Sequence, residues 1–283
     1  MDISRREFVG IGAGACLADA AAAGKIKVRG LRIGVTDWNL NMTGKVEAFE
    51  LAKKLGFAGV EVSLGRVPVN GKLALDNAEL QAQYLAAVKK TKVPIASVCL
   101  DIWHVNPLKT DPLARKWLAG AIPIAGKLKA PTMLLPIFGK NVPQGPAELD
   151  QFADALKEFM PAAEKAKVVL CLEDSVTAPD NVRMFDRVGS KYLRSFYDVA
   201  NVLGLKVDPV KELRFLGKDR IGCIHLKDRG YLGESGRLDF RAILEALRDI
   251  GYAGWANLET NSPSKDLEAD MKKNLAFVRS MLA

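Results

Sequence analysis

The stretch VVLCLE at residues 168–173 decides the fold, because it shows a pattern that the chain repeats from end to end. An apolar run rich in β-branched residues stops at a charged residue, and helical stretches separate it from the runs before and after it. Such runs recur eight times, and we expect each to be a β-strand. The expected strands are Leu31–Thr36, Gly59–Ser63, Ile95–Leu100, Thr132–Ile137, Val168–Glu173, Ser195–Asp198, Ile221–Lys227 and Trp255–Thr260.

Amphipathic segments lie between these runs and are expected to be helices. They include Val46–Leu55, Asn77–Lys90, Leu149–Lys165 and Phe240–Ile250. Gly56 and Gly251 follow the first and last of them, as glycine commonly does where a helix stops. Strand–helix units repeated eight times predict a (β/α)8 TIM barrel in one domain over residues 24–283. A doubly wound sheet would usually carry a glycine-rich phosphate turn after its first strand, and Ile33–Thr36 leads into none.

Residues 1–23 are predicted to be an export signal rather than part of the barrel. Arg5 and Arg6 precede a small, weakly apolar stretch, and Ala20 to Ala23 offer cleavage sites. This arrangement resembles a twin-arginine signal and predicts a periplasmic or secreted protein. The alternative is a helical tail on a cytosolic protein.

Composition narrows the function classes. The 283 residues are 49% hydrophobic and 26% charged, which is typical of a globular protein and excludes disordered, collagen-like and coiled-coil chains. No apolar run beyond the signal is long enough to span a membrane. The net charge is +8, but the basic residues are scattered, so we expect no nucleic-acid partner. The sequence leaves the oligomeric state open, a homo-oligomer included.

The cysteines beyond the signal are Cys99, Cys171 and Cys223, and each lies in an apolar run. An odd number of cysteines in such positions favours buried free thiols over a disulfide framework.

Four consecutive expected strands deliver Glu173, Asp198, His225 and Glu259 at or near their carboxyl ends. In a barrel these ends meet at the face that carries the chemistry. Charged residues flanked by apolar ones are costly unless they pair or bind a metal. Three carboxylates and one imidazole suit Mn²⁺ or Mg²⁺ best, with Co²⁺ or Zn²⁺ as alternatives. The competing interpretation is four separate salt-bridged or rim residues.

Several segments together resemble the sugar phosphate isomerase/epimerase family, whose members are xylose isomerase-like barrels. The matching segments are LEDS at Glu173, YDVAN at Asp198, IHLKDR at His225, NLETN at Glu259, GFAGVEVS with Glu61, and GESGRLDF at residues 233–240. The resemblance implies that Glu173, Asp198, His225 and Glu259 bind a divalent metal. It also implies that Glu173 and Glu259 act as acid and base.

Such a site predicts proton transfer at a carbon next to a carbonyl group, because metal binding to the carbonyl oxygen acidifies that C–H bond. The leading hypothesis is a metal-dependent isomerase or epimerase of a keto-sugar. A lyase or dehydratase acting on an oxidised (3-keto) glycoside or an inosose would start with the same step. A third alternative, from another class, is a non-catalytic periplasmic sugar-binding barrel.

Other residues are candidates for binding a carbohydrate substrate or for stabilising the negative charge that develops on it during the reaction. Lys227 alternates inward with His225 and is assigned an electrostatic catalytic role. The candidate substrate-binding residues are Trp38, Glu61, Trp103, His104, Asn201 and Arg229. Asn201 stands where ketose 3-epimerases carry a substrate-binding histidine, which argues against that activity. With two histidines in the whole chain, a three-metal nuclease centre is excluded.

Overall fold

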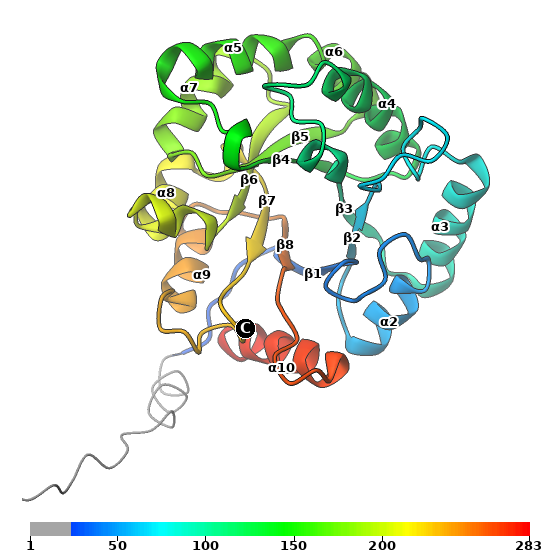
Figure 1. The fold of residues 1–283 in the computed structure, drawn as a ribbon. Helices are drawn as coiled ribbons and strands as arrows, with labels where there is room; N and C mark the ends of the chain where they lie inside the picture. Colours follow the sequence, from blue (N-terminus) through cyan, green and yellow to red (C-terminus); the bar gives the residue numbers. More distant parts are fainter. Residues whose placement is uncertain (1–23) are drawn as a thin grey trace, which may run out of the picture.

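The structure, a computed structural model, describes residues 24–283. Within that range eight parallel strands close into a barrel in chain order, and β8 pairs with β1 to complete it. Figure 1 shows the helices arranged around the outside of this barrel. The strands are β1 (Arg32–Thr36), β2 (Val60–Ser63), β3 (Ile95–Cys99), β4 (Thr132–Ile137), β5 (Val169–Asp174), β6 (Leu193–Asp198), β7 (Ile221–Leu226) and β8 (Trp255–Leu258). The predicted single-domain TIM barrel is confirmed.

The helices that cover the barrel begin and end within a few residues of most predictions. They are α2 (Ala48–Leu55), α3 (Ala78–Thr91), α4 (Leu113–Lys127), α5 (Gly145–Lys157), α6 (Met160–Ala166), α7 (Ala178–Val188), α8 (Pro209–Leu216), α9 (Phe240–Asp249) and α10 (Leu267–Met281). Short 3-10 turns follow several strands, among them η1 (Asp101–His104) and η3 (Asn201–Leu205). Gly56 ends α2 with φ 91°, a left-handed conformation that glycine adopts without strain.

The prediction of a single helix over Leu149–Lys165 was wrong. The structure has two helices there, α5 and α6, and Pro161 lies in the first turn of the second. Proline has no N–H to donate to the carbonyl four residues earlier, and its ring collides with that carbonyl. The hydrophobic pattern continues across the break, but the backbone cannot.

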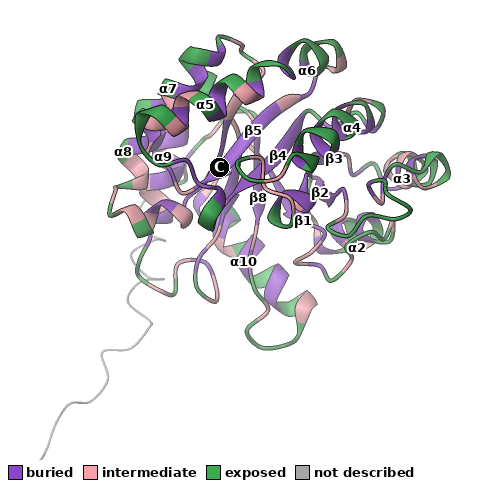
Figure 2. Cartoon of the chain, turned by 45° about the horizontal axis from the view of Figure 1, so that its top comes forward, coloured by how far each residue is buried: buried purple, intermediate pink, exposed green. Residues whose placement is uncertain are grey.

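Two apolar clusters hold the fold together. The larger lies between the barrel and its helices, and a smaller one inside the barrel includes Cys171, Phe196, Cys223 and Trp255. Figure 2 shows the strands as almost continuously buried. Cys99, Cys171 and Cys223 are buried and free, as predicted. The inner cluster closes the barrel below the site, so a ligand enters from the carboxyl ends of the strands.

No helix among residues 24–283 is long and apolar enough to cross a membrane. The predicted export signal lies outside the described residues.

Candidate active site and metal centre

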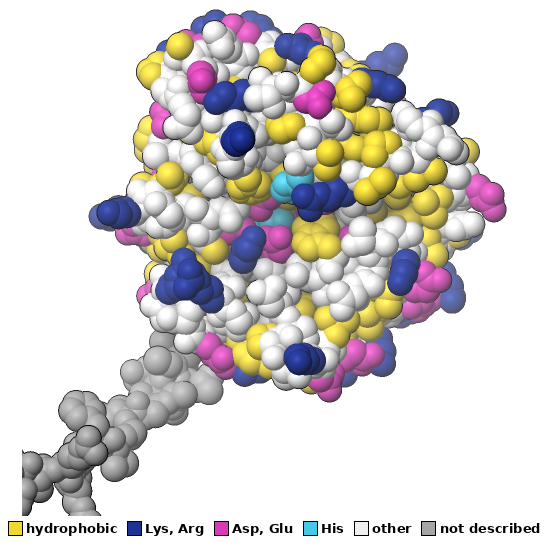
Figure 3. Space-filling view, in the orientation of Figure 1, with side chains coloured by type: hydrophobic (Ala, Val, Ile, Leu, Met, Phe, Trp, Pro, Cys, Tyr) yellow, Lys and Arg dark blue, Asp and Glu magenta, His cyan; other side chains and the backbone are white. Residues whose placement is uncertain are grey.

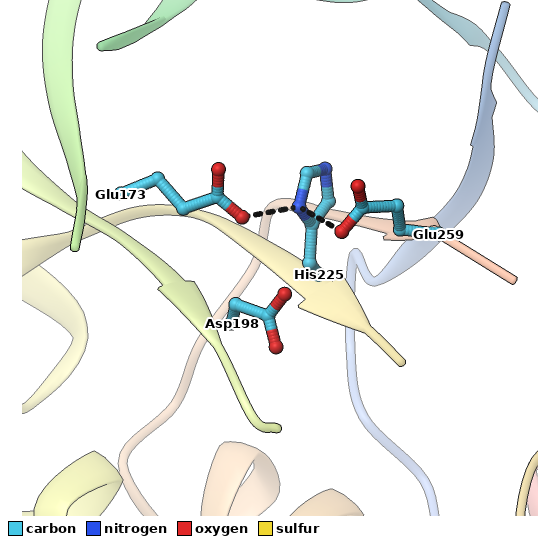
Figure 4. Close-up of side chains that lie close together, drawn as sticks. All are labelled: Glu173, Asp198, His225 and Glu259. Carbon is cyan, nitrogen blue, oxygen red and sulfur yellow. Dashed lines mark hydrogen bonds and ion pairs between the residues drawn. The ribbon is translucent and has the colours of Figure 1, made fainter. Parts of the chain in front are cut away.

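Strand register brings the four predicted ligands to one level of the barrel. Asp198 on β6 lies beside His225 on β7, Glu173 comes from β5, and Glu259 follows the last residue of β8. Each of the four offers a ligand atom, and these atoms all lie within 4.8 Å of one another. Figure 4 shows Glu173 and Glu259 approaching His225 from opposite sides, with Asp198 completing the group.

His225 is fully buried and lies between carboxylates. Its Nδ1 is 3.0 Å from Glu173 Oε1 and 3.4 Å from Glu259 Oε2, and its Nε2 is 3.0 Å from Glu61 Oε2. Burial lowers the pKa of His225, but the carboxylates of Glu61, Glu259 and Glu173 outweigh burial and hold that pKa well above its usual value. The Nδ1 nitrogen therefore points into the cluster and the Nε2 nitrogen points out of it.

Asp198 has one satisfied oxygen and one unsatisfied oxygen. Oδ1 accepts the backbone N–H groups of Ala200 at 2.7 Å and Asn201 at 3.1 Å. Oδ2 is buried without a hydrogen-bond donor, and the ammonium of Lys227 lies 3.5 Å away. A buried carboxylate oxygen in this condition is costly, and a cation bound among the four residues would satisfy it.

The two glutamates differ in electrostatic environment. Burial, reinforced by Glu259 and Asp198 and opposed by His225, raises the pKa of Glu173 to about 8. Burial also acts to raise the pKa of Glu259, but His225 and Lys227 reverse the effect and lower it. Like charges at such short range repel one another, so the donor set has the size, charge and oxygen content to hold a divalent cation.

Hydrogen bonds fix each glutamate in place. Lys227 Nζ donates to Glu259 Oε2 at 2.7 Å, and the Trp38 indole N–H reaches Glu259 Oε1 at 3.3 Å. Asn201 Nδ2 lies 3.4 Å from Glu173 Oε1. Three of the residues predicted from sequence as catalytic or substrate-binding therefore contact the glutamates directly.

A cavity of about 520 Å³ opens above this group. Its walls include the two glutamates, Lys227 and three aromatic or imidazole rings. It is lined by Trp38, Thr43, Ser63, Arg66, Cys99, Asp101, His104, Leu134, Phe138, Glu173, Asn201, Lys227 and Glu259. Figure 3 shows histidine and acidic side chains gathered at the centre of this face, with basic side chains close to them. A cavity of this size suits a small polar ligand.

Three residues predicted to bind substrate lie elsewhere. Trp103 is 1% exposed, and its indole N–H donates to the Ala114 carbonyl at 3.1 Å, so it packs beneath the rim. Arg229 is exposed and does not line the cavity. Glu61 is fully buried below His225. None of these three lines the cavity, so their assignment to substrate contact stays a prediction.

The structure adds residues that the sequence prediction missed. Asp101 begins the turn η1 two residues after the end of β3. It accepts a hydrogen bond from Ser63 Oγ at 2.5 Å, and both residues line the cavity. Asp101 could have been predicted, because functional residues of a barrel commonly lie just after the carboxyl ends of its strands. Arg66 lies on an irregular loop, and no periodic signal marked it.

A barrel with a buried carboxylate–imidazole cluster at the carboxyl ends of its strands defines a class of metal-site (β/α)8 proteins. The model of the xylose isomerase-like TIM barrel family matches residues 49–281. The chain belongs to this family.

Two relatives with detectable sequence similarity are named as sugar epimerases. The 3-dehydro-D-guloside 4-epimerase of Escherichia coli is 24% identical over 275 residues, which cover 88% of this chain and 100% of the relative. A putative L-ribulose-5-phosphate 3-epimerase of Escherichia coli is 28% identical over 233 residues, covering 74% of this chain and 80% of the relative.

Among solved structures, the IolI protein with a bound zinc atom superposes with a TM-score of 0.70 at 15% identity, covering 88% of this chain and 98% of that one. This likeness establishes the shared fold.

Proposed function

We propose that this protein is a divalent-metal-dependent epimerase of a keto-sugar, with Glu173 and Glu259 as its two proton-transfer groups. The observation that carries the proposal is the placement of these glutamates on opposite sides of His225, both lining one cavity. Epimerisation requires a proton to leave one face of a carbon and to return on the other. Two carboxylates that line the same cavity and approach from opposite sides meet this requirement.

The division of labour follows from the positions of the side chains. One glutamate accepts the proton from the carbon next to the carbonyl group, and the electron pair of the broken C–H bond moves onto the carbonyl oxygen. The second glutamate, which starts the reaction protonated, then gives its proton to the same carbon from the opposite face, as the electron pair returns from the oxygen to form the new C–H bond. Lys227, held 2.7 Å from Glu259, supplies positive charge close to where negative charge develops.

Glu173, Asp198, His225 and Glu259 would hold the metal. When bound, a divalent cation polarises the carbonyl group and lowers the cost of charge on its oxygen. The three carboxylates make the donor set predominantly hard oxygen, so we propose Mn²⁺ or Mg²⁺ as the native ion, with Co²⁺ or Zn²⁺ as functional substitutes.

We propose an oxidised sugar carried on a glycoside as the substrate. The relative that is matched over its whole length is named as a 3-dehydro-D-guloside 4-epimerase. A solved structure with a similar fold is described as a 3-keto-D-glucoside 4-epimerase. Trp38 and the parallel pair of His104 and Phe138, whose ring centroids lie 6.0 Å apart, offer flat surfaces to the apolar faces of a sugar.

Product analysis with a 3-keto-glucoside tests this assignment against its competitors. The metal-loaded protein should convert the substrate to its 4-epimer and leave the glycosidic bond intact, as seen by NMR. Release of the aglycone would identify a lyase instead. Tight binding without any change in the sugar would identify a binding protein. Removal of the metal with a chelator should stop the conversion, and addition of Mn²⁺ should restore it.

A further inference from the structure

Glu61 lies on the side of His225 that faces away from the cavity. It is fully buried on β2, and its Oε2 lies 3.0 Å from His225 Nε2. The other ring nitrogen, Nδ1, faces Glu173 Oε1 at 3.0 Å and Glu259 Oε2 at 3.4 Å. The imidazole is therefore contacted by carboxylates through both nitrogens, and only Nδ1 faces the proposed metal centre.

The neighbours of Glu61 make it a hydrogen-bond acceptor. Asn257 on β8 donates from Nδ2 to Glu61 Oε2 at 2.7 Å and to Ser97 Oγ at 3.0 Å. Gly34 on β1 leaves the space that Asn257 occupies, because a Cβ atom at position 34 would collide with the Asn257 side-chain oxygen. The Asn257 N–H and the His225 ring nitrogen thus converge on one carboxylate oxygen, which can accept an N–H from each of them.

A metal binds the neutral imidazole, so the proton that the His225 ring loses on metal binding can leave either nitrogen, and two tautomers compete. A proton on Nδ1 would be attracted to Glu173 and Glu259, and it would occupy the lone pair that a metal requires. A proton on Nε2 satisfies Glu61 and leaves the Nδ1 lone pair directed into the cluster. The carboxylate of Glu61 is the contact that favours the second arrangement.

We propose that Glu61 is a positioning residue that holds the proton of His225 on Nε2 and so prepares Nδ1 to bind the divalent cation. This inference rests on the proposed metal site and assigns a role to a residue outside it. Carboxylates that orient metal-binding histidines in this way typically contribute about 10- to 100-fold to metal affinity.

Metal affinity provides the first test. Titration calorimetry with Mn²⁺ should show the dissociation constant of Glu61→Gln rising by roughly 10- to 100-fold over the parent protein. Asp37→Asn is the matched control, because Asp37 is also fully buried near the end of a strand but accepts from the Ser63 N–H at 3.1 Å and not from His225. Its Mn²⁺ affinity should stay close to that of the parent. Equal affinities for the parent and Glu61→Gln would overturn the inference alone, whereas no Mn²⁺ binding by the parent would overturn the metal site as well.

The scarcity of histidine allows a second test that needs no change at Glu61. The chain contains two histidines, His104 and His225, so ¹⁵N-imidazole spectra hold two spin systems, and His104→Asn assigns them. In the Zn²⁺-loaded protein the His225 signals should show a proton on Nε2 and the metal on Nδ1. The Nε2 proton should also resonate far downfield, as expected for a strong hydrogen bond to a carboxylate. Coordination through Nε2, or an Nε2 proton without that shift, would contradict the proposal even if Glu61→Gln does not fold.

Discussion

At the scale of single residues, the charge balance of the site depends on Lys227. Its ammonium lies 2.7 Å from Glu259 and 3.5 Å from Asp198, and these contacts, which burial opposes, raise the pKa of Lys227 above its usual value. The side chain is therefore a permanent cation next to the proposed proton-transfer groups, and a Schiff-base role would require it to be neutral.

Lys227→Met should separate catalysis from metal binding. Turnover should fall by roughly 100-fold, because a cation next to the developing charge is lost. The metal dissociation constant should not rise, since Lys227 repels a cation bound beside it. Steady-state kinetics and calorimetry on the same preparation measure both quantities. A large loss of metal affinity with unchanged turnover per loaded site would contradict the assignment.

The four residues of the proposed metal site could be predicted from sequence because each lies at or near the carboxyl end of an apolar strand, where the ends of neighbouring strands meet. Glu61 was found as an acidic residue on its strand, but its partner was not found, since His225 is 164 positions away. Such a contact depends on the barrel closing with a particular register, which no local pattern records.

At the scale of elements, the barrel requires close approach between neighbouring strands. Gly34 on β1 faces Asn257 on β8, and an added Cβ atom would meet the Asn257 side chain, with the Gly59 carbonyl also only 3.3 Å away. A residue without a side chain is therefore needed at this point of the interior.

Gly34→Ala should destabilise the fold by about 1–3 kcal/mol, the usual cost of overpacking a core. Denaturant unfolding followed by circular dichroism measures the change. Gly120→Ala on α4 is the matched control, because nothing lies within 4 Å of a Cβ atom there. That control should be neutral or slightly stabilising. A Gly34→Ala protein as stable as the parent would show that the strands can separate at no cost.

A second element-level feature is the N-terminal part of α10, which organises two of the loops above the barrel. Asp270 accepts hydrogen bonds from Ser262 Oγ at 2.5 Å, Ser264 Oγ at 2.6 Å and Tyr231 OH at 2.6 Å. Burial acts to raise the pKa of Asp270, but the hydrogen bonds from Ser262, Ser264 and Tyr231 prevail and lower it to about 2.

This carboxylate should stabilise the protein above its unfolded-state pKa of 3.8, and the contribution should disappear as the pH falls toward 2. Asp270→Asn should accordingly lower the melting temperature at pH 7, and the difference from the parent should shrink near pH 3. Thermal unfolding at the two pH values makes the comparison. A difference that is the same at both would argue against a charge-dependent role.

Element boundaries were less predictable than the elements themselves. Strand β8 stops at Leu258 rather than at Thr260, although the Glu259 N–H still donates to the Leu226 carbonyl at 3.1 Å. This hydrogen bond continues the pairing of β8 with β7 by one residue, so Glu259 keeps the direction of the strand. Pro161 was the sequence signal for the break between α5 and α6. The prediction missed it because the apolar pattern continues across the break.

At the scale of the whole molecule, the sequence divides into the barrel and the segment 1–23, which we propose directs export. Replacing Arg5 and Arg6 together by lysine should leave the uncleaved precursor in the cytoplasm, because the paired arginines are the feature that defines the proposed signal. Cell fractionation with mass spectrometry of the product follows both location and processing. Arg29→Lys, beyond the expected cleavage region, serves as the control and should be exported normally. Export of the doubly substituted chain at the parent's level would refute the proposal.

The central claim is that two glutamates share the proton transfers of an epimerisation. The most direct measurement is deuterium exchange between D₂O and each epimer of a 3-keto-glycoside, for the metal-loaded parent, Glu173→Gln and Glu259→Gln. The parent should place deuterium in both epimers. Each variant should fail to epimerise, yet it should still exchange the proton of one epimer, a different one for each variant, since the remaining glutamate faces one side of the carbon. If either variant epimerised at the parent's rate, or if both exchanged the same epimer, the account would be contradicted.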